Sequence, residues 1–184
     1  MEKLKIVAIV GSLRKGSFNR QLALAAQKAL GDRAEFELLH YADVPFMDQD
    51  IEYPAPEAVR RVRETVKAAD GIWFFTPEYN HFFPGVLKNL IDWLSRPISQ
   101  SERQVLSGKP AAISGISPGM AGTVCAQDHL VMLLSLLNMR VMNLPRLTIP
   151  NATQQLDAKG SLALTTSAPY LEKQANAFLT FISK

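Results

Sequence analysis

The sequence predicts an α/β fold: a doubly wound, five-stranded parallel sheet in the order 2-1-3-4-5, with helices on both faces. Apolar runs of strand length alternate with segments of helical period along the chain, which is the pattern of parallel α/β folds. A length of 184 residues with 47% hydrophobic composition suits a single domain over residues 1–184 with a sizeable core.

Five apolar runs are the expected strands, and each is short enough to cross a sheet once. They are LKIVAIV (4–10), AEFELL (34–39), GIWFF (71–75), PAAISGI (110–116) and RVMNL (140–144). Apolar residues at helical spacing lie between and after them, and they predict helices around residues 18–29, 59–69, 84–95, 128–137 and 171–182. Two long excursions remain, at 43–57 and 145–160.

The charge pattern favours small anionic ligands over nucleic acid. Charged residues make up 20% of the chain, the net charge is +3, and no lysine or arginine block marks a nucleic-acid arm. The apolar centre of the N-terminal segment is too short for a signal peptide, and no stretch approaches the roughly 18 apolar residues of a membrane span. We therefore expect a cytoplasmic protein without membrane partners.

The loops after the first and third strands are the expected location of function. Doubly wound sheets bind ligands beyond the strand carboxyl ends where the strand order reverses, which here lies between those two strands. The loops are GSLRKGSFNR (11–20) and TPEYNHFFPG (76–85), the two richest in polar and special residues.

The first loop has the composition of a phosphate site. Gly11 permits a tight exit from the strand, while the hydroxyls of Ser12 and Ser17, the amide of Asn19 and the first helical N–H groups can donate to one anion. Arg14 adds positive charge. Neither the Walker pattern nor GxGxxG matches this loop, so a terminal phosphate monoester fits better than ATP or a dinucleotide. The alternative is that Ser17 only caps the helix and the glycines only turn the chain.

The second loop offers the surroundings of a flat ring. Pro77 stiffens the start, Tyr79 supplies an aromatic face, and Glu78 and Asn80 supply acceptors and donors. A planar heterocycle with a phosphate tail at this switch point indicates FMN. The alternative is that Tyr79 is an ordinary packing residue.

Four stretches of the chain resemble the bacterial NADPH-dependent FMN reductase family, in particular its chromate and quinone reductase branch. They are GSLRKGSFNR, TPEYN with PGVLKNLIDWLSR, LSGKP and VMNLP, and the resemblance covers nearly the whole chain. It implies a flavodoxin-like fold, one non-covalent FMN per subunit, and assembly as a homodimer or homotetramer. It also implies hydride transfer from NADPH or NADH through FMN to quinones or similar acceptors, among them chromate, azo and nitro compounds, by a ping-pong mechanism.

The resemblance also implies the residues that hold the cofactor. Those for the ribityl phosphate are Ser12, Leu13, Arg14, Gly16, Ser17, Phe18 and Asn19. Those for the ring are Pro77, Glu78, Tyr79 and Asn80, and those from a looser third loop, SGISPGMAGT, are Gly115, Ile116, Ser117 and Gly119. No catalytic side chain is expected, because hydride transfer takes place at the flavin N5.

Two residues depart from the family pattern. Phe82 stands where the family often has a small residue, and Thr123 stands where it often has a second glycine. Both departures bear on the shape of the acceptor pocket. We expect Phe82 to overhang the open flavin face and Phe83 to point inward.

Histidines, the cysteine and the aspartates give no independent site. His81 is a candidate proton donor to a quinone, but a solvent-facing loop histidine is the simpler interpretation. Cys125 has no second thiol for a disulfide or zinc site, and a buried structural thiol is the default. Asp43, Asp48 and Asp50 lack the spacing of a metal site, so no metal is expected.

Three other functions share the predicted fold. A flavodoxin-type electron carrier would bind FMN but is usually strongly acidic, whereas this chain has a net charge of +3. A free-flavin reductase and a binding module for another phosphorylated aromatic ligand remain alternatives. The apolar stretch HLVMLLSLL (129–137) is more hydrophobic than one sheet face needs, which indicates a subunit interface.

Overall fold

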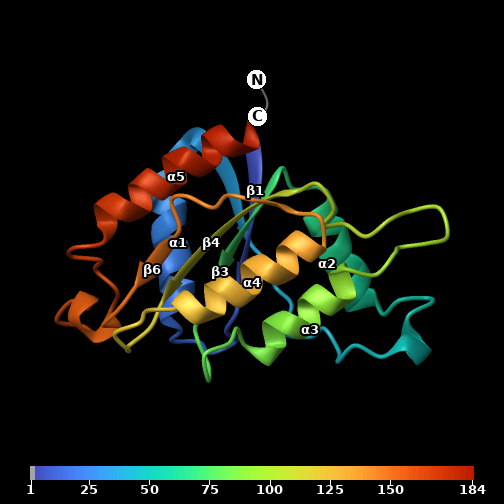
Figure 1. Cartoon of the computed structure of the whole chain (residues 1–184), viewed down its shortest axis with the longest axis horizontal. Coiled ribbons are helices and arrows are strands. Elements are labelled where there is room, and N and C mark those ends of the chain that lie inside the picture. The colour runs from blue at the N-terminus through green and yellow to red at the C-terminus, as the bar shows by residue number, and fades with distance from the viewer. Residues whose placement is uncertain (1–2) are drawn as a thin grey trace.

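A parallel sheet in the order β2-β1-β3-β4-β5 forms the centre of the molecule, as the sequence predicts (Figure 1). The computed structural model describes residues 3–184. The four longer strands are β1 (Leu4–Val10), β2 (Ala34–Leu38), β3 (Gly71–Phe75) and β4 (Pro110–Ile116). β1 pairs with β2 and with β3, and β3 pairs with β4, in each case in parallel.

The fifth position of the sheet is shared by two short strands. β5 (Arg140–Val141) pairs with the start of β4, and β6 (Leu147–Ile149) pairs with its end, both in parallel. The sequence predicts one strand over 140–144 and an excursion over 145–160. The chain leaves the sheet before Pro145, which has no N–H to donate to a strand partner, and then returns as β6.

Helices cover both faces of the sheet. They are α1 (Phe18–Leu30), α2 (Glu57–Lys67), α3 (Gly85–Leu94), α4 (Val124–Leu136) and α5 (Ala168–Ile182). α4 begins four residues earlier than the apolar period predicts. Short 3-10 turns occur at Gly31–Arg33, Gln49–Ile51 and Ala152–Gln155. Within residues 3–184, no helix has the length and apolar content needed to cross a bilayer.

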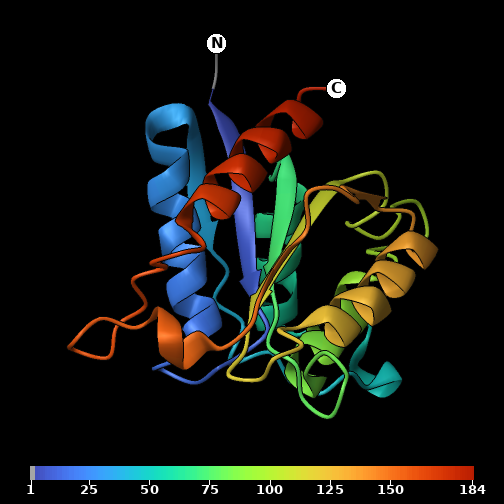
Figure 2. The same cartoon turned by 60° about the vertical axis from the view of Figure 1, so that its left-hand side comes forward.

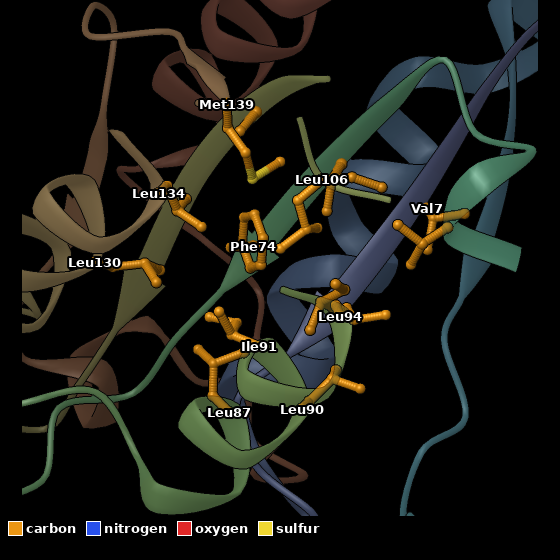
Figure 3. Close-up of a cluster of buried hydrophobic side chains, with 14 of the residues drawn as sticks. Val7, Phe74, Leu87, Leu90, Ile91, Leu94, Leu106, Leu130, Leu134 and Met139 are labelled. Atoms are coloured by element: carbon orange, nitrogen blue, oxygen red, sulfur yellow. The ribbon is translucent and has the colours of Figure 1, made fainter. Parts of the chain in front are cut away.

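The strand period of two divides the core into two layers. Val7, Ile9 and Phe74 face α2, α3 and α4, whereas Ile6, Ala8 and Trp73 face α1 and α5. Figure 2 shows α1 and α5 on one side of the sheet and α3 and α4 on the other. The labelled side chains of Figure 3 surround Phe74 from several elements: Leu87 and Ile91 of α3, Leu130 and Leu134 of α4, and Met139.

A buried polar chain fastens α5 to the middle of the sheet. Trp73 Nε1 donates to Ser114 Oγ at 2.8 Å, and Ser114 Oγ donates to Gln174 Oε1 at 2.6 Å. Gln174 Nε2 donates to the carbonyl oxygens of Ile113 and Pro145, each at 2.9 Å. Satisfied polar groups of this kind fix one packing arrangement, because an unpaired buried group is costly.

Gly115 lets the start of α4 approach β4 closely. A Cβ at this position would collide with Thr123 Oγ1 and would lie 2.5 Å from the Thr76 carbonyl oxygen. Thr123 itself is fully buried. Glycine is therefore required at position 115, because a larger residue would not fit between β4 and the Thr123 side chain.

We expect Gly115→Ala to lower the free energy of unfolding by about 1 to 3 kcal/mol, as overpacking of a core typically does. Urea unfolding followed by circular dichroism measures the change. Gly85→Ala is the matched control, because a Cβ at Gly85 meets nothing within 4 Å. Equal stability of the two variants would show that the packing argument is wrong.

Candidate functional site

Three loops from separate parts of the chain meet at the carboxyl ends of β1, β3 and β4. They enclose a hollow of about 250 Å³. Its lining consists of Ser12, Arg14, Ser17, Phe18, Asn19, Pro77, Glu78, Tyr79, Ile116, Ser117 and Pro118. Two of the larger hollows, of about 480 and 840 Å³, lie between α1 and α5 and around residues 97–103, away from the switch point.

The first loop presents donors to this hollow. Gly11 N still donates to the Phe75 carbonyl oxygen at 2.8 Å, so the chain turns away only after the sheet ladder ends. Ser17 Oγ accepts a hydrogen bond from Arg20 N at 3.3 Å and caps α1, which leaves its O–H free to donate to a ligand. The first-turn N–H groups of Phe18 and Asn19 have no intrahelical partner. Helix capping and anion binding are thus compatible here.

Arg14 shapes the first loop as well as charging it. Its Nη2 donates to the Gly16 carbonyl oxygen at 2.6 Å, and its guanidinium carbon lies 5.6 Å from the centroid of the Phe18 ring. The side chain is exposed and lies at the edge of the hollow. A positive charge is therefore held beside the helix start, where an anion is already favoured.

Asn19 joins the first loop to the third. Its Oδ1 accepts from Ile116 N at 3.0 Å, and its Nδ2 donates to the Ile116 carbonyl oxygen at 2.9 Å. The residue is only 2% exposed. Both polar atoms of its side chain bond to the Ile116 backbone, so its main role is to position the two loops.

The second loop ends in a two-residue hairpin. Tyr79 and Phe82 exchange backbone hydrogen bonds at 2.9 and 3.0 Å, and Asn80 and His81 between them have φ values of 53° and 62°. Positive φ at both central residues is the mark of a type I′ turn. Tyr79 is 54% exposed beside the hollow, whereas Asn80 lies at the hairpin tip outside the lining.

Glu78 ties the second loop to α4. Its Oε2 accepts a hydrogen bond from Ala126 N at 3.0 Å, in the first turn of the helix. The side chain is only 10% exposed. The carboxylate thus satisfies a first-turn N–H group and complements the positive end of the helix dipole.

The third loop is held by the strand that the sequence did not predict. Ser117 N donates to the Ile149 carbonyl oxygen at 3.1 Å, and Ala152 N donates to the Ser117 carbonyl oxygen at 3.0 Å. Ile149 is the last residue of β6. Because the sequence predicts no strand within 145–160, it does not predict these hydrogen bonds. Pro118, which lines the hollow, is also absent from the predicted site residues.

Five of the sequence-predicted residues lie outside this lining. Leu13 is 49% exposed and faces a neighbouring hollow, and Gly16 is exposed on the first loop. Asn80 lies at the hairpin tip, Gly115 packs behind β4, and Gly119 is exposed beyond Pro118.

The two departures from the family pattern have different surroundings. Phe83 is 4% exposed and faces inward as expected, while Phe82 is 43% exposed. The Phe82 ring lies 4.3 Å from the His129 ring, centroid to centroid, so it leans toward α4 at the rim of the site. Thr123 is buried behind β4 and does not line the hollow. Phe82 does not line the hollow either, but it is exposed and its backbone pairs with that of Tyr79, which does, so a change of its side chain acts beside the pocket mouth.

Tyr41 stabilises the end of β1 from the neighbouring loop. Its hydroxyl donates to the Val10 carbonyl oxygen at 2.6 Å, and burial raises the pKa of the phenol far above its ordinary value. The side chain therefore stays neutral and remains a donor throughout the ordinary pH range. It holds the residue just before the first loop in place.

The comparisons with known proteins agree over almost the full chain. The model of the NADPH-dependent FMN reductase family matches residues 4–154. A 2-hydroxy-1,4-benzoquinone reductase from Burkholderia sp. is 38% identical over 97% of this chain and 96% of its own length. A quinone reductase from Escherichia coli K12 is 37% identical over 100% and 97%.

A solved structure agrees equally well. The flavoenzyme NAD(P)H:acceptor oxidoreductase from Paracoccus denitrificans superposes with a TM-score of 0.88 at 36% identity. The match covers 98% of this chain and 97% of that one.

We expect Asn19→Ala to lower the free energy of unfolding by about 2 to 4 kcal/mol. The change leaves the N–H and the carbonyl of Ile116 without partners, and an unsatisfied buried group typically costs about 1 to 3 kcal/mol. Chemical unfolding of the flavin-free protein isolates this effect from ligand binding. Lys15→Ala, an exposed change in the same loop, is the control and should leave stability within about 0.5 kcal/mol. A similarly small loss for Asn19→Ala would refute the positioning role.

Proposed function

The chain belongs to the NADPH-dependent FMN reductase family and is an FMN-dependent NAD(P)H oxidoreductase, and we propose that quinones are its electron acceptors. Relatives named as quinone reductases, 37–38% identical over nearly the full chain, support this choice. The structural observation behind the proposed function is that three loops meet at one hollow. The first loop contributes hydrogen-bond donors to this hollow, and the second contributes the exposed ring of Tyr79.

The residues present fit FMN. A phosphate needs convergent hydroxyl and N–H donors, which Ser12, Ser17 and the first turn of α1 supply next to the Arg14 charge. A flat ring needs a rigid border, which Pro77 and Tyr79 supply. When bound, FMN supplies the hydride transfer between NAD(P)H and the acceptor.

The side chains of this protein bind and orient, and none is needed as an acid or base. We assign phosphate binding to the first loop, and ring binding to residues 77–79 and 116–118. Tyr79, which lines the hollow, is 54% exposed, so the side of the site that it borders is open to solvent. NAD(P)H and the quinone would use this open side in turn, which gives ping-pong kinetics.

A basic groove beside the first loop supports NADPH over NADH as the electron donor. Arg14, Lys15 and Arg20 line a neighbouring hollow, of about 500 Å³, that shares Ser12 and Arg14 with the proposed flavin site. The extra phosphate of NADPH is a dianion that such a groove would attract. We propose that it binds there.

An exposed apolar stripe on α4 supports assembly. Val124, Met132 and Leu136 are 42%, 69% and 81% exposed on one helix. Exposed apolar surface of this kind is typical of subunit interfaces, so we propose a homodimer or homotetramer. We also propose that residues 1–184 act as one flavin-binding domain, and that the enzyme works in the cytoplasm, where NAD(P)H is available.

The first test is a steady-state assay of the FMN-loaded protein with NADPH and a small benzoquinone. We expect NADPH oxidation to depend on the quinone, parallel lines in double-reciprocal plots, and a higher kcat/KM for NADPH than for NADH. Free FMN as the only acceptor provides the comparison. Faster turnover with free FMN than with the quinone would favour a flavin reductase, and turnover with neither acceptor would favour an electron carrier.

The second test concerns Arg14. We expect Arg14→Ala to weaken FMN binding about ten- to a hundred-fold, because a hydrogen bond to a charged group contributes about 1.5 to 3 kcal/mol. Turnover of the fully loaded variant should change much less. Fluorescence titration of the apoprotein with FMN measures the dissociation constant, and Lys28→Ala, exposed further along α1, is the charge-matched control. Equal affinity of both variants would remove Arg14 from the binding site.

A further inference from the structure

Glu78, His81 and Cys125 form a cluster beside the proposed flavin site, and no local pattern in the sequence predicts it. One ligand atom from each residue lies within 4.8 Å of the ligand atoms of the other two. Two of the residues belong to the second loop and one to the start of α4. We propose that these three side chains bind a divalent cation of the zinc class.

The hairpin brings the imidazole to the carboxylate. His81 occupies the second central position of the type I′ turn at φ 62°, a conformation that histidine adopts more readily than most residues. Its Nδ1 lies 3.5 Å from Glu78 Oε1. The turn pairs Tyr79 with Phe82, and the His81 side chain at its second central position reaches back to the residue before the turn, Glu78.

The bond between Glu78 and α4 brings the carboxylate to the thiol. Glu78 Oε2 accepts from Ala126 N at 3.0 Å, and Cys125 is the residue directly before Ala126. This contact occupies one carboxylate oxygen and leaves Oε1 as the free ligand atom. The hydrogen bond fixes the carboxylate in the way that the outer partners of metal ligands usually do.

The separations are close to those that a tetrahedral ion requires. Zinc lies about 2.3 Å from sulfur and about 2.0 to 2.2 Å from nitrogen or oxygen, which places neighbouring ligand atoms about 3.3 to 3.8 Å apart. The Glu78–His81 distance already lies in this range. No pair of the three ligand atoms is more than 4.8 Å apart, and the His81 side chain, 81% exposed, is free to move toward the other two.

The donor set selects the class of cation. A thiolate, an imidazole and a carboxylate suit zinc and similar borderline ions, whereas Mg²⁺ and Ca²⁺ prefer six or more oxygen ligands. Three protein ligands leave a fourth position for water on the exposed side. His129 does not compete through Nδ1, because that atom lies 2.9 Å from the Cys125 carbonyl oxygen.

A bound cation would fasten the hairpin to α4. The segments already meet through the hydrogen bond from Ala126 to Glu78, the contact between the Phe82 and His129 rings, and the burial of Phe83 in the same core cluster as Ala126 and Leu130. Because the cation would bind only the folded arrangement, its binding should also raise the unfolding temperature. Cation binding is independent of which electron acceptor the enzyme uses.

The test uses the FMN-loaded protein, with Cys125 kept reduced by a phosphine. Titration calorimetry with Zn²⁺ should give one ion per chain, and an excess of Mg²⁺ should not compete. Co²⁺ serves as the spectroscopic probe, since a cobalt–thiolate charge-transfer band in the difference spectrum reports ligation by sulfur. A stoichiometry below one half, or a cobalt spectrum without this band, would overturn the proposal.

Variants separate the three-residue site from adventitious binding. Cys125→Ser should abolish the thiolate band, and both Cys125→Ser and His81→Asn should weaken Zn²⁺ binding at least about tenfold, since even the loss of an outer partner costs about 10- to 100-fold. Asparagine keeps the left-handed backbone, so His81→Asn removes the imidazole without straining the turn. His40→Asn, an exposed histidine outside the cluster, is the matched control and should bind Zn²⁺ like the parent. Equal Zn²⁺ affinity in all three variants would show that the cluster is not the site.

Discussion

Parallel pairing of β1, β3 and β4 is the constraint on which the rest of the molecule depends. The register pairs Val10 with Phe75 and Phe75 with Ser114, so the three strands reach one edge of the sheet together. Gly11 N and Thr76 N each extend the ladder by one more hydrogen bond before the chain turns away. The three loops therefore leave from adjacent points, and the hollow between them follows from backbone geometry before any side chain is considered.

The strands of the sheet centre were predictable because burial on both faces leaves a clear mark. β1, β3 and β4 read as nearly continuous apolar runs, which is how a strand covered by helices on both sides must read. The sheet edge was less predictable. RVMNL and LTI have similar local character, and their division into β5 and β6 depends on where each can pair with β4. No local pattern carries that information.

For the candidate site too, one part was predictable from the sequence and another was not. Residue types predicted which loops meet at the hollow, because the polar and special residues are concentrated in the segments that follow β1 and β3. They did not predict which residues face the ligand and which hold the loops. Asn19 is a donor in sequence terms, yet both of its polar atoms bond Ile116, 97 positions along the chain. Cys125 and His81 are likewise separated by α3, β4 and the segments that connect them, so only the fold could bring them together.

The site has a part held by buried contacts and a part on an exposed hairpin, and the two should differ in how well they tolerate substitution. Asn19 holds the first and third loops together through its bonds to Ile116, and Gly115 leaves the space that the buried Thr123 side chain occupies, so substitutions at these positions disturb buried contacts. His81 and Phe82 lie on an exposed two-residue hairpin whose backbone shape is set by its own hydrogen bonds. Substitutions there alter the rim without loosening the donors around α1. The acceptor selectivity and cation affinity that we propose for this hairpin can therefore change while the proposed flavin site stays intact.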